Sequence, residues 1–482
     1  MQRFSEQLQQ LVKSRKIAVC ALAEQSGVGR TLIHKMLKGE RVPAKREAVQ
    51  ALSSALMLTP EENRALFESW LAAKMGEGVY ARRKFVLDFY NQFDSAPETN
   101  LVWESGQRPV RVLSENGVVY GNLEVRNLAG AVLETEAAKE SGHIRIVAQP
   151  ECSHLFDFLS VLGRRRKSMT VDHVLCLENS QNEQNGLYNL SSLRSIIPIL
   201  ASGCRYRLQC YYDSVAGHFG STSILPYLIL TEDYAVRIAH DASCAAVSSL
   251  PQYLTLYGRI FETLMEKSES FVTVFHSPLE QISYINRLYD DFACLEHDFT
   301  SDPCLLVFAG EDMVRRHLSP ALLKQEATVR AILEYMKFAG FKSRMKNMGN
   351  VYFSENGLDR FLATGRLTEV PAEYYSPLDQ SNRYRLLRSM YEASLAGDYH
   401  PVLVNGQKLR IPGNLCTYSM KNGAVCFTYT APRREHTTFL VTEQSVVTAI
   451  QDFLDYLPES DFVYSHEETL RYLKKKLENA PF

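Results

Sequence analysis

Five short segments with helical spacing of apolar residues fill the first 75 residues, and they constrain the fold more than any other feature. In residues 4–12, apolar side chains recur three or four positions apart, as on one face of a helix. The second segment stops at Ser26-Gly27, where glycine permits a tight turn between helices, and the third stops at Gly39. The fifth begins at residues 59–62, Thr-Pro-Glu-Glu, a capped helix start. The pattern predicts an all-α N-terminal domain.

Charge is unevenly divided along the chain. The formal net charge is −2, but residues 1–75 carry twelve Lys and Arg against seven Glu and no Asp. Within residues 13–46, nine basic residues stand against two acidic ones. A compact basic segment on an otherwise acidic chain indicates a polyanionic partner, although a solvated basic face would have the same composition.

The second and third predicted helices carry a motif of defined spacing. The residues of the motif are Leu22-Ala23-Glu24, Gly27-Val28, Ile33, Lys38-Gly39 and Pro43. Over residues 4–70 the chain resembles the Xre/Cro-type helix-turn-helix family of bacterial and phage regulators. It departs from the family pattern at Gly29, where a Ser or Thr cap is usual, and at Leu37, where a polar residue is usual.

The resemblance implies that the third helix enters the major groove of double-stranded DNA. The outward positions of that helix are the candidate base-contacting residues: Arg30, Thr31, His34 and Lys35. The candidate phosphate contacts are Lys13, Arg15, Lys38 and Arg41. Members of this family bind paired half-sites, which implies a homodimer on a palindromic operator. The alternative is a five-helix unit that binds protein.

The rest of the chain resembles no family. We expect an α+β multidomain protein: a five-helix helix-turn-helix domain at 1–75, a connector helix at 76–95, and two mixed α/β lobes at 96–300 and 301–482. The connector is also a candidate dimer contact. Further elements expected from local pattern are a hairpin turn at Asn116-Gly117 between strands 110–113 and 118–125, a polar loop at 179–189, a helix at 279–295, a strand at 305–308 and a final helix capped by Ser465 and Glu468.

Signals for chemistry in these lobes are weak. The residues with metal-ligand potential are Asp290, Asp291, Cys294 and His297. A helix end with a buried cysteine explains them more simply, so we expect no metal and no cofactor. Cys152 with His154, and His173 with Cys176, form a nucleophile and base only if the fold joins them.

One charge run stands out in the body. Arg164, Arg165, Arg166 and Lys167 follow an apolar helix and are candidates for binding an anionic effector, although a solvated turn is the more common explanation for such a run.

These features predict a DNA-binding transcription regulator with a large region for effector sensing or oligomerisation. The alternative is an enzyme or defence-system component that uses the helix-turn-helix as a tether or for autoregulation. Ten scattered cysteines without a CxxC pair, and an N-terminus that lacks an apolar signal core, favour the cytoplasm. Since no window approaches 18 uninterrupted apolar residues, we expect no membrane partner.

Overall fold

The computed structural model describes residues 2–93, 116–179, 183–275, 280, 295–339, 349–421, 423–430 and 436–480. The chain divides into two compact units, residues 1–86 and 87–482. Helices and turns make up the described part of the first unit, whereas the second contains two mixed sheets. The mixed α/β character expected for the body is confirmed. None of the described helices combines the length and apolar character that crossing a membrane requires.

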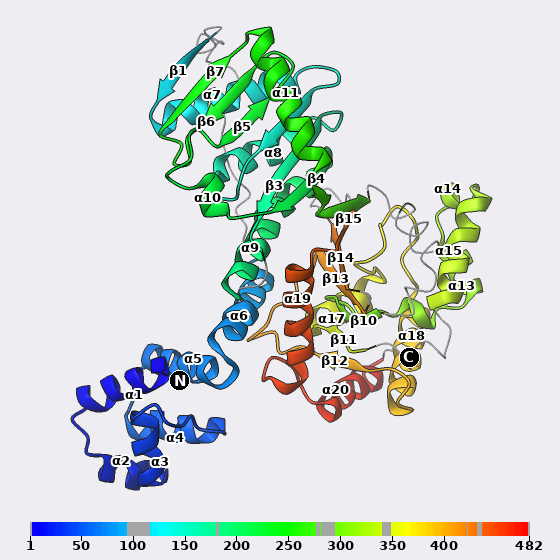
Figure 1. The fold of residues 1–482 in the computed structure, drawn as a ribbon. Coiled ribbons are helices and arrows are strands. Elements are labelled where there is room, and N and C mark those ends of the chain that lie inside the picture. Colours follow the sequence, from blue (N-terminus) through cyan, green and yellow to red (C-terminus); the bar gives the residue numbers. More distant parts are fainter. Residues whose placement is uncertain are drawn as a thin grey trace. The chain divides into compact units, whose positions relative to one another are not determined.

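The first unit is built on helices α1 to α5 (Figure 1). Their bounds are Gln2–Ser14, Val19–Ser26, Arg30–Leu37, Arg46–Ala55 and Pro60–Met75. Their apolar faces meet in one core, which includes Phe4, Leu8, Leu22, Ile33, Met36, Val49, Leu52, Leu66 and Trp70. The indole N–H of Trp70 donates to the carbonyl of Pro43 at 2.8 Å, which ties the loop after α3 to α5.

Two glycines end α2 and α3 in the left-handed conformation. Gly27 has φ 68° and donates its N–H to the carbonyl of Ala23 at 3.0 Å. Gly39 has φ 73°, and the next N–H, of Glu40, returns to the carbonyl of Lys35 at 2.9 Å. Residues other than glycine rarely adopt this conformation. The turn between α2 and α3 is therefore only three residues long.

The fifth helix begins with the capping box expected from the sequence. The Thr59 hydroxyl accepts from the N–H of Glu62 at 3.2 Å, and the Glu62 carboxylate accepts from the N–H of Thr59 at 2.9 Å. Helix α6 (Glu77–Asn91) follows, and the division between the units falls inside it, after Val86.

Among the described residues, sheet A has eight strands in the order β1-β7-β6-β5-β2-β3-β4-β8. The bounds are β1 Asn116–Tyr120, β2 His143–Val147, β3 Thr170–Leu177, β4 Arg205–Tyr212, β5 Tyr227–Leu230, β6 Ala235–Ile238, β7 Cys244–Ser248 and β8 Glu269–Ser270. Strands β2, β3 and β4 are parallel, and every other pairing in this sheet is antiparallel. The parallel trio lies toward one side of the sheet, where β3 is almost wholly buried.

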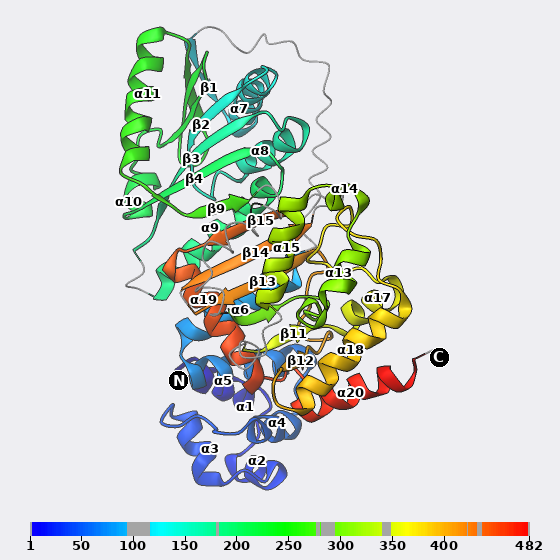
Figure 2. The same ribbon diagram turned by 90° about the vertical axis from the view of Figure 1, so that its right-hand side faces the viewer.

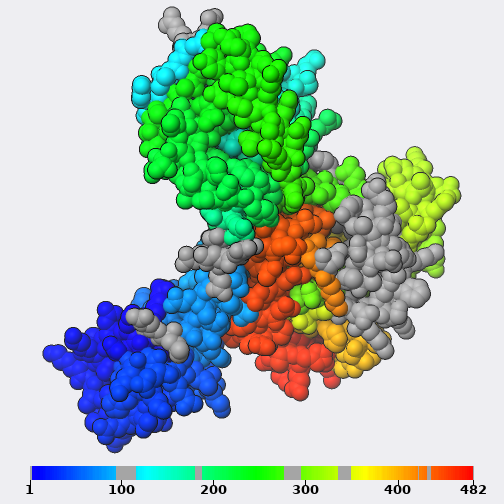
Figure 3. All heavy atoms as spheres, in the orientation of Figure 1, coloured from blue at the N-terminus to red at the C-terminus, as the bar shows by residue number. Residues whose placement is uncertain are grey.

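Helices cover both faces of sheet A. The helices of this region are α7 (Asn122–Ala137), α8 (Ser153–Arg165), α9 (Glu183–Leu200), α10 (Val215–Phe219) and α11 (Pro251–Glu266). Helices α7 and α8 lie on one face and α11 on the other (Figure 2). The outer side of α11 lies at the surface (Figure 3) and exposes Tyr253, Leu256 and Ile260.

Sheet B has seven strands in the order β12-β11-β10-β13-β14-β15-β9. The bounds are β9 Val272–Phe275, β10 Leu295–Phe299, β11 Val351–Phe353, β12 Pro401–Leu403, β13 Leu415–Met420, β14 Ala424–Thr430 and β15 His436–Val441. Strands β10, β11 and β12 are parallel, and the others pair antiparallel. Sheet B therefore repeats the combination of a parallel trio with antiparallel neighbours.

The helices of the sheet B region are interleaved with its strands along the chain. The bounds are η3 Leu306–Phe308, α13 Glu311–His317, α14 Pro320–Leu323, α15 Glu326–Ala339, α17 Glu355–Thr364, α18 Gln380–Leu395, α19 Gln444–Tyr456, η4 Leu457–Glu459 and α20 His466–Glu478. Helix α19 and the end of α6 contact one face, where Tyr90 packs 4.6 Å from the Phe299 ring and donates to Thr417 at 3.2 Å. Because Val86, Phe89 and Tyr90 are buried within the chain, these side chains of the connector helix are not available as a dimer contact.

Four of the local expectations are corrected. Asn116-Gly117 lies inside β1, and part of the strand expected at 118–125 belongs to α7. Residues 183–189, expected in a loop, belong to α9. The apolar run at 305–308 forms η3 instead of a strand. Residue 295, the end of the expected helix 279–295, begins β10; most of that range and strand 110–113 lie outside the described residues.

Candidate functional site

The outward side of α3 gathers the four candidate base-contacting residues. Arg30, Thr31, His34 and Lys35 are all exposed, whereas Ile33 and Met36 are fully buried in the core of the first unit. Gly29, at the N-cap position, gives the helix no side-chain cap. Two positive charges, an imidazole and a hydroxyl thus occupy one exposed face of an eight-residue helix.

The four candidate phosphate contacts are exposed, but they are not equivalent. Arg15 is engaged inside the unit: its Nε donates to the carbonyl of Leu56 at 3.1 Å, and its Nη2 lies 2.5 Å from the Glu62 carboxylate. It joins the end of α4 to the capped start of α5. Lys13, in the last turn of α1, and Lys38, which ends α3, are better placed to contact a ligand.

The basic run Arg164–Lys167 lies at the C-terminal end of α8, not in a separate loop. Arg164 and Arg165 are the last two helical residues, Arg166 is the cap, and all four side chains are exposed. Arg164 donates back to Ser160 at 3.2 Å. Cations at a helix C-terminus are favoured by the helix dipole, which disfavours an anion there. This position supports a structural role for the run.

Neither cysteine–histidine combination forms a nucleophilic pair. The Cys152 sulfur lies 3.7 Å from His154 Nε2, but burial raises the pKa of Cys152 to about 12 and lowers that of His154 to about 4. Both groups are therefore neutral at pH 7, so the thiolate that nucleophilic attack needs is absent. His173 and Cys176 lie on opposite faces of β3, since their positions differ by an odd number.

His173 instead pairs with the Tyr206 side chain in the interior of sheet A. Its Nε2 lies 3.0 Å from the carbonyl of Ala148, and its Nδ1 contacts the Tyr206 hydroxyl. Burial lowers the pKa of His173 to about 4. The ring is therefore uncharged at pH 7.

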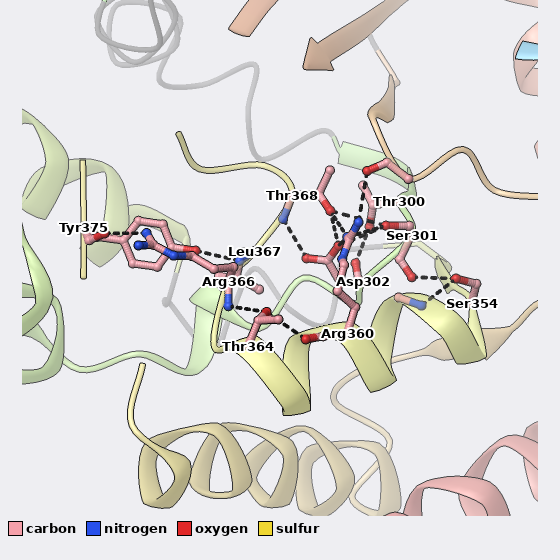
Figure 4. Close-up of polar contacts among 12 residues, drawn as sticks. Thr300, Ser301, Asp302, Ser354, Arg360, Thr364, Arg366, Leu367, Thr368 and Tyr375 are labelled. Carbon is pink, nitrogen blue, oxygen red and sulfur yellow. Dashed lines mark hydrogen bonds and ion pairs between the residues drawn. The ribbon is translucent and has the colours of Figure 1, made fainter. Parts of the chain in front are cut away.

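A charged network follows the C-terminal ends of the parallel strands in sheet B (Figure 4). Asp302 is buried; its carboxylate lies 2.6 Å from Arg360 Nη2 and accepts from the Thr368 N–H at 2.9 Å. The Ser301 hydroxyl donates to the same carboxylate at 3.0 Å. Ser354, which caps α17, donates to the Ser301 carbonyl at 3.0 Å. The Asp302 carboxylate is fully hydrogen-bonded, and its partners beyond Ser301 come from α17 and the loop after α17. Asp302 therefore links the end of β10 to these two elements.

Two further carboxyl groups lie beside this network, and neither forms an ion pair with a basic side chain of the described residues. Asp298 is buried, and neither of its oxygens has a hydrogen-bond partner of normal geometry among the described residues. Burial and the nearby Glu369 carboxylate raise the pKa of Asp298 well above its usual range, although Thr300 and Cys304 lower it slightly. Burial and Asp302 raise the pKa of Glu369 to about 7, against the effect of the Tyr418 hydroxyl, which donates to Glu369 at 3.1 Å. Both carboxyl groups therefore hold a proton to higher pH than an exposed carboxyl group does.

His297 lies in a different kind of element from the one expected. Asp290, Asp291 and Cys294 lie outside the described residues, and His297 lies in strand β10, not in a helix. Its Nε2 is 2.8 Å from Asp455 Oδ1, in the last turn of α19. The described partner of this histidine is therefore more than 150 positions away in the sequence.

Sequence reasoning missed Asp302, Arg360 and Glu369 as a group. In the sequence, Asp302 stands only as the second residue of the lobe expected at 301–482. Only the parallel pairing of β10 with β11 brings residue 302 next to α17. A polar residue directly after a short apolar strand was the one local signal available.

The sequence matches no family model and no curated protein. Among solved structures, the chain is similar to the crystal structure of phosphatidylserine synthase from Haemophilus influenzae Rd KW20. The identity is 9%, the match covers 76% of this chain and 93% of that one, and the TM-score is 0.23. A TM-score this low supports no argument about fold or activity.

Proposed function

We propose that this chain is a sequence-specific, DNA-binding transcription regulator of the Xre/Cro type. The observation that carries the proposal is the arrangement of α2 and α3: a three-residue turn at Gly27, a helix anchored by Ile33 and Met36, and an outer face with Arg30 and Lys35 exposed. A helix presented in this way fits the major groove, where arginine and lysine donate to guanine acceptors.

The basic residues around this face divide into two roles in the proposal. Arg30, Thr31, His34 and Lys35 contact base edges and choose the sequence. Lys13, Lys38 and Arg41 neutralise phosphates, which adds affinity for any sequence. Arg15 acts indirectly, because its guanidinium holds α4 to α5.

The proposed regulator acts as a homodimer on a palindromic operator, since one short helix contacts too few base pairs for strong selection. The second unit then senses an effector or holds the dimer together. The protein acts in the cytoplasm, where its operator would be found.

The deciding experiment begins with selection of duplexes from a random pool by the full chain. The enriched duplex and a scrambled duplex are then titrated by fluorescence anisotropy at several salt concentrations. For Arg30→Ala we expect a loss of ~1–3 kcal/mol on the enriched duplex and relaxed preference at one base pair. For Lys38→Ala we expect similar weakening on both duplexes and a shallower salt dependence.

A matched control removes the same charge elsewhere. Arg385 and Arg388 are exposed residues of α18, so their double alanine variant loses the same two charges as Arg30→Ala/Lys35→Ala. The proposal fails if the two double variants bind the enriched duplex equally well. It also fails if no sequence is enriched over the pool selected by Arg30→Ala/Lys35→Ala. Genome-wide occupancy in the native host, compared with the same variant, tests regulation directly.

A further inference from the structure

Three potential metal ligands meet between sheet B and helix α19. Glu296 and His297 come from β10, and Asp455 comes from the last turn of α19. One ligand atom of each residue lies within 4.8 Å of the others. Around one ion with bonds of about 2.0–2.2 Å, adjacent ligand atoms lie about 3 Å apart and opposite ones just over 4 Å.

A bulge in β10 explains why two neighbours in sequence share this site. The pairing of β10 with β13 shifts register between Leu295 and His297, so that Glu296 is the extra residue. Strand neighbours normally alternate between faces, and a bulge suspends that rule locally. Gln451 of α19 donates to Glu296 Oε2 at 3.2 Å and to the carbonyl of Met420 at 2.9 Å, which holds the Glu296 side chain toward the helix.

The electrostatics of the cluster favour a cation. Two carboxylates face one imidazole, and no lysine or arginine pairs with either carboxylate in the described ranges. Asp455 also lies at the C-terminal end of α19, where the helix dipole is negative and a carboxylate is disfavoured. A bound cation would offset both effects.

The burial of the His297 side chain is a second observation on this site. Its side chain is 94% buried, and its Nε2 lies 2.8 Å from Asp455 Oδ1. Its Nδ1 is buried and has no hydrogen-bond partner among the described residues. A buried imidazole whose Nε2 points at the Asp455 carboxylate is placed to share a divalent ion with that carboxylate.

We propose that Glu296, His297 and Asp455 form a divalent metal site that joins β10 to α19. One nitrogen and two carboxylate oxygens suit a first-row ion such as Zn²⁺ or Mn²⁺. Asp455 is 61% exposed, so the site opens to solvent, and water completes the coordination. The proposal is independent of DNA binding.

The test uses the full chain with Cys20, an exposed thiol on α2, replaced by serine to remove a competing soft ligand. The protein is treated with a chelator, dialysed and titrated with Zn²⁺ against a chromogenic chelator. We expect one equivalent bound with micromolar or tighter affinity, and a rise in the thermal midpoint of unfolding. Co²⁺ added instead should give visible absorption bands without thiolate charge transfer.

Variants locate the site. Asp455→Asn should weaken Zn²⁺ binding at least tenfold, and His297→Gln should abolish it. Because Asp455 is exposed, its variant should keep the circular dichroism spectrum of the parent. The matched control is His218→Gln. His218 and Asp213 also lie 2.8 Å apart, and no third ligand among the described residues lies within the distance that groups Glu296, His297 and Asp455.

Each outcome of these titrations either supports or overturns the proposed site. Binding of one equivalent that Asp455→Asn and Glu296→Gln weaken, and that His218→Gln leaves unchanged, supports the site. Absence of stoichiometric binding overturns the proposal. Binding that survives Asp455→Asn overturns it as well, because the ion then lies elsewhere.

Discussion

Sheets A and B share an arrangement of strands but bury different ionisable side chains. Each contains three adjacent parallel strands, and in each a serine after one of these strands caps a helix: Ser214 after β4 and Ser354 after β11. In sheet A the parallel trio buries the neutral His173 next to Asp172, which is paired with Arg207 and His143. In sheet B the parallel trio buries the carboxyl of Asp298, which lies near Glu369 of the loop after α17. The comparison teaches that the arrangement of strands in a sheet does not determine which ionisable side chains are buried in it.

The largest expected difference between the two regions comes from one glycine in each. A Cβ at Gly357 of α17 would lie 1.7 Å from the backbone oxygen of Ser301, whereas one at Gly163 of α8 would meet the side-chain oxygen of Ser202 at 2.1 Å. The Ser202 hydroxyl can rotate away, so that only the Ser202 Cβ, at 2.8 Å, has to shift, whereas all three of the nearest atoms at Gly357 belong to the backbone. We expect Gly357→Ala to cost about 3 kcal/mol or more and Gly163→Ala roughly 1 kcal/mol, measured by urea unfolding. Since both residues are helical, the gain in helix propensity cancels between them. Equal losses would show that the first turn of α17 can move.

The next difference is in how the free energy of unfolding depends on pH. His173 and Glu369 change it in opposite directions. His173 has a pKa near 4 in the folded protein and 6.5 as its ordinary value, so its contribution to stability is full above pH 6.5 and is lost as the pH falls toward 4. Glu369 has a pKa near 7 against an ordinary 4.5, so its contribution is full below pH 4.5 and is lost as the pH rises toward 7. Each amounts to roughly 3 kcal/mol.

Because the two windows overlap, the wild-type contributions of these residues offset each other between about pH 4.5 and 6.5. We expect His173→Gln to leave a free energy of unfolding that falls with rising pH over this range. We expect Glu369→Gln to leave one that rises. Urea unfolding of both variants at pH 4.5, 5.5 and 6.5 measures the slopes. Parallel slopes in the two variants would contradict the comparison.

A smaller difference is expected for the arginines that hold a buried aspartate in each region. Asp302 loses its only described basic partner in Arg360→Ala, whereas Asp172 keeps His143 at 2.8 Å in Arg207→Ala. An unpaired buried carboxylate is costly. We expect losses of about 2–3 kcal/mol for Arg360→Ala and about 1 kcal/mol for Arg207→Ala in thermal unfolding. A greater loss for Arg207→Ala would mean that Ser301 and Thr368 suffice for Asp302.

The smallest expected difference concerns the two serine caps. The Ser354 hydroxyl accepts from the Gly357 N–H at 3.0 Å and also donates to the Ser301 carbonyl, while Ser214 only caps the five-residue α10. We expect Ser354→Ala to cost about 1 kcal/mol and Ser214→Ala about half of that. Hydrogen exchange of the first-turn amides of each helix gives a local measurement. A larger effect in α10 would reverse the ranking.

Features determined by neighbouring residues could be predicted from the sequence. The capping boxes at Thr59 and Ser465 were expected and are present, because cap and partner lie three positions apart. Gly27 and Gly39 mark the ends of α2 and α3 for the same reason. The helices of the first unit were therefore placed well, while their DNA-binding role stays a prediction.

Features determined by distant partners could not be predicted. The polar residues of 183–189 are helical because Asn189 turns inward, where its amide exchanges two 3.0 Å hydrogen bonds with the backbone of Glu178. Asn116-Gly117 is drawn into a strand by β7, about 130 residues later. The candidate metal ligand His297 was singled out, but Asp455 was not, since no sequence spacing links them.

The position of Arg15 has a consequence for genetics. Its bonds to Leu56 and Glu62 join the end of α4 to the start of α5. Under the proposed function, a screen for mutants that lose regulation would therefore recover substitutions at Arg15 together with those at Arg30. The two classes would differ in the amount of protein that accumulates in the cell, so an immunoblot would separate a folding lesion from a recognition lesion.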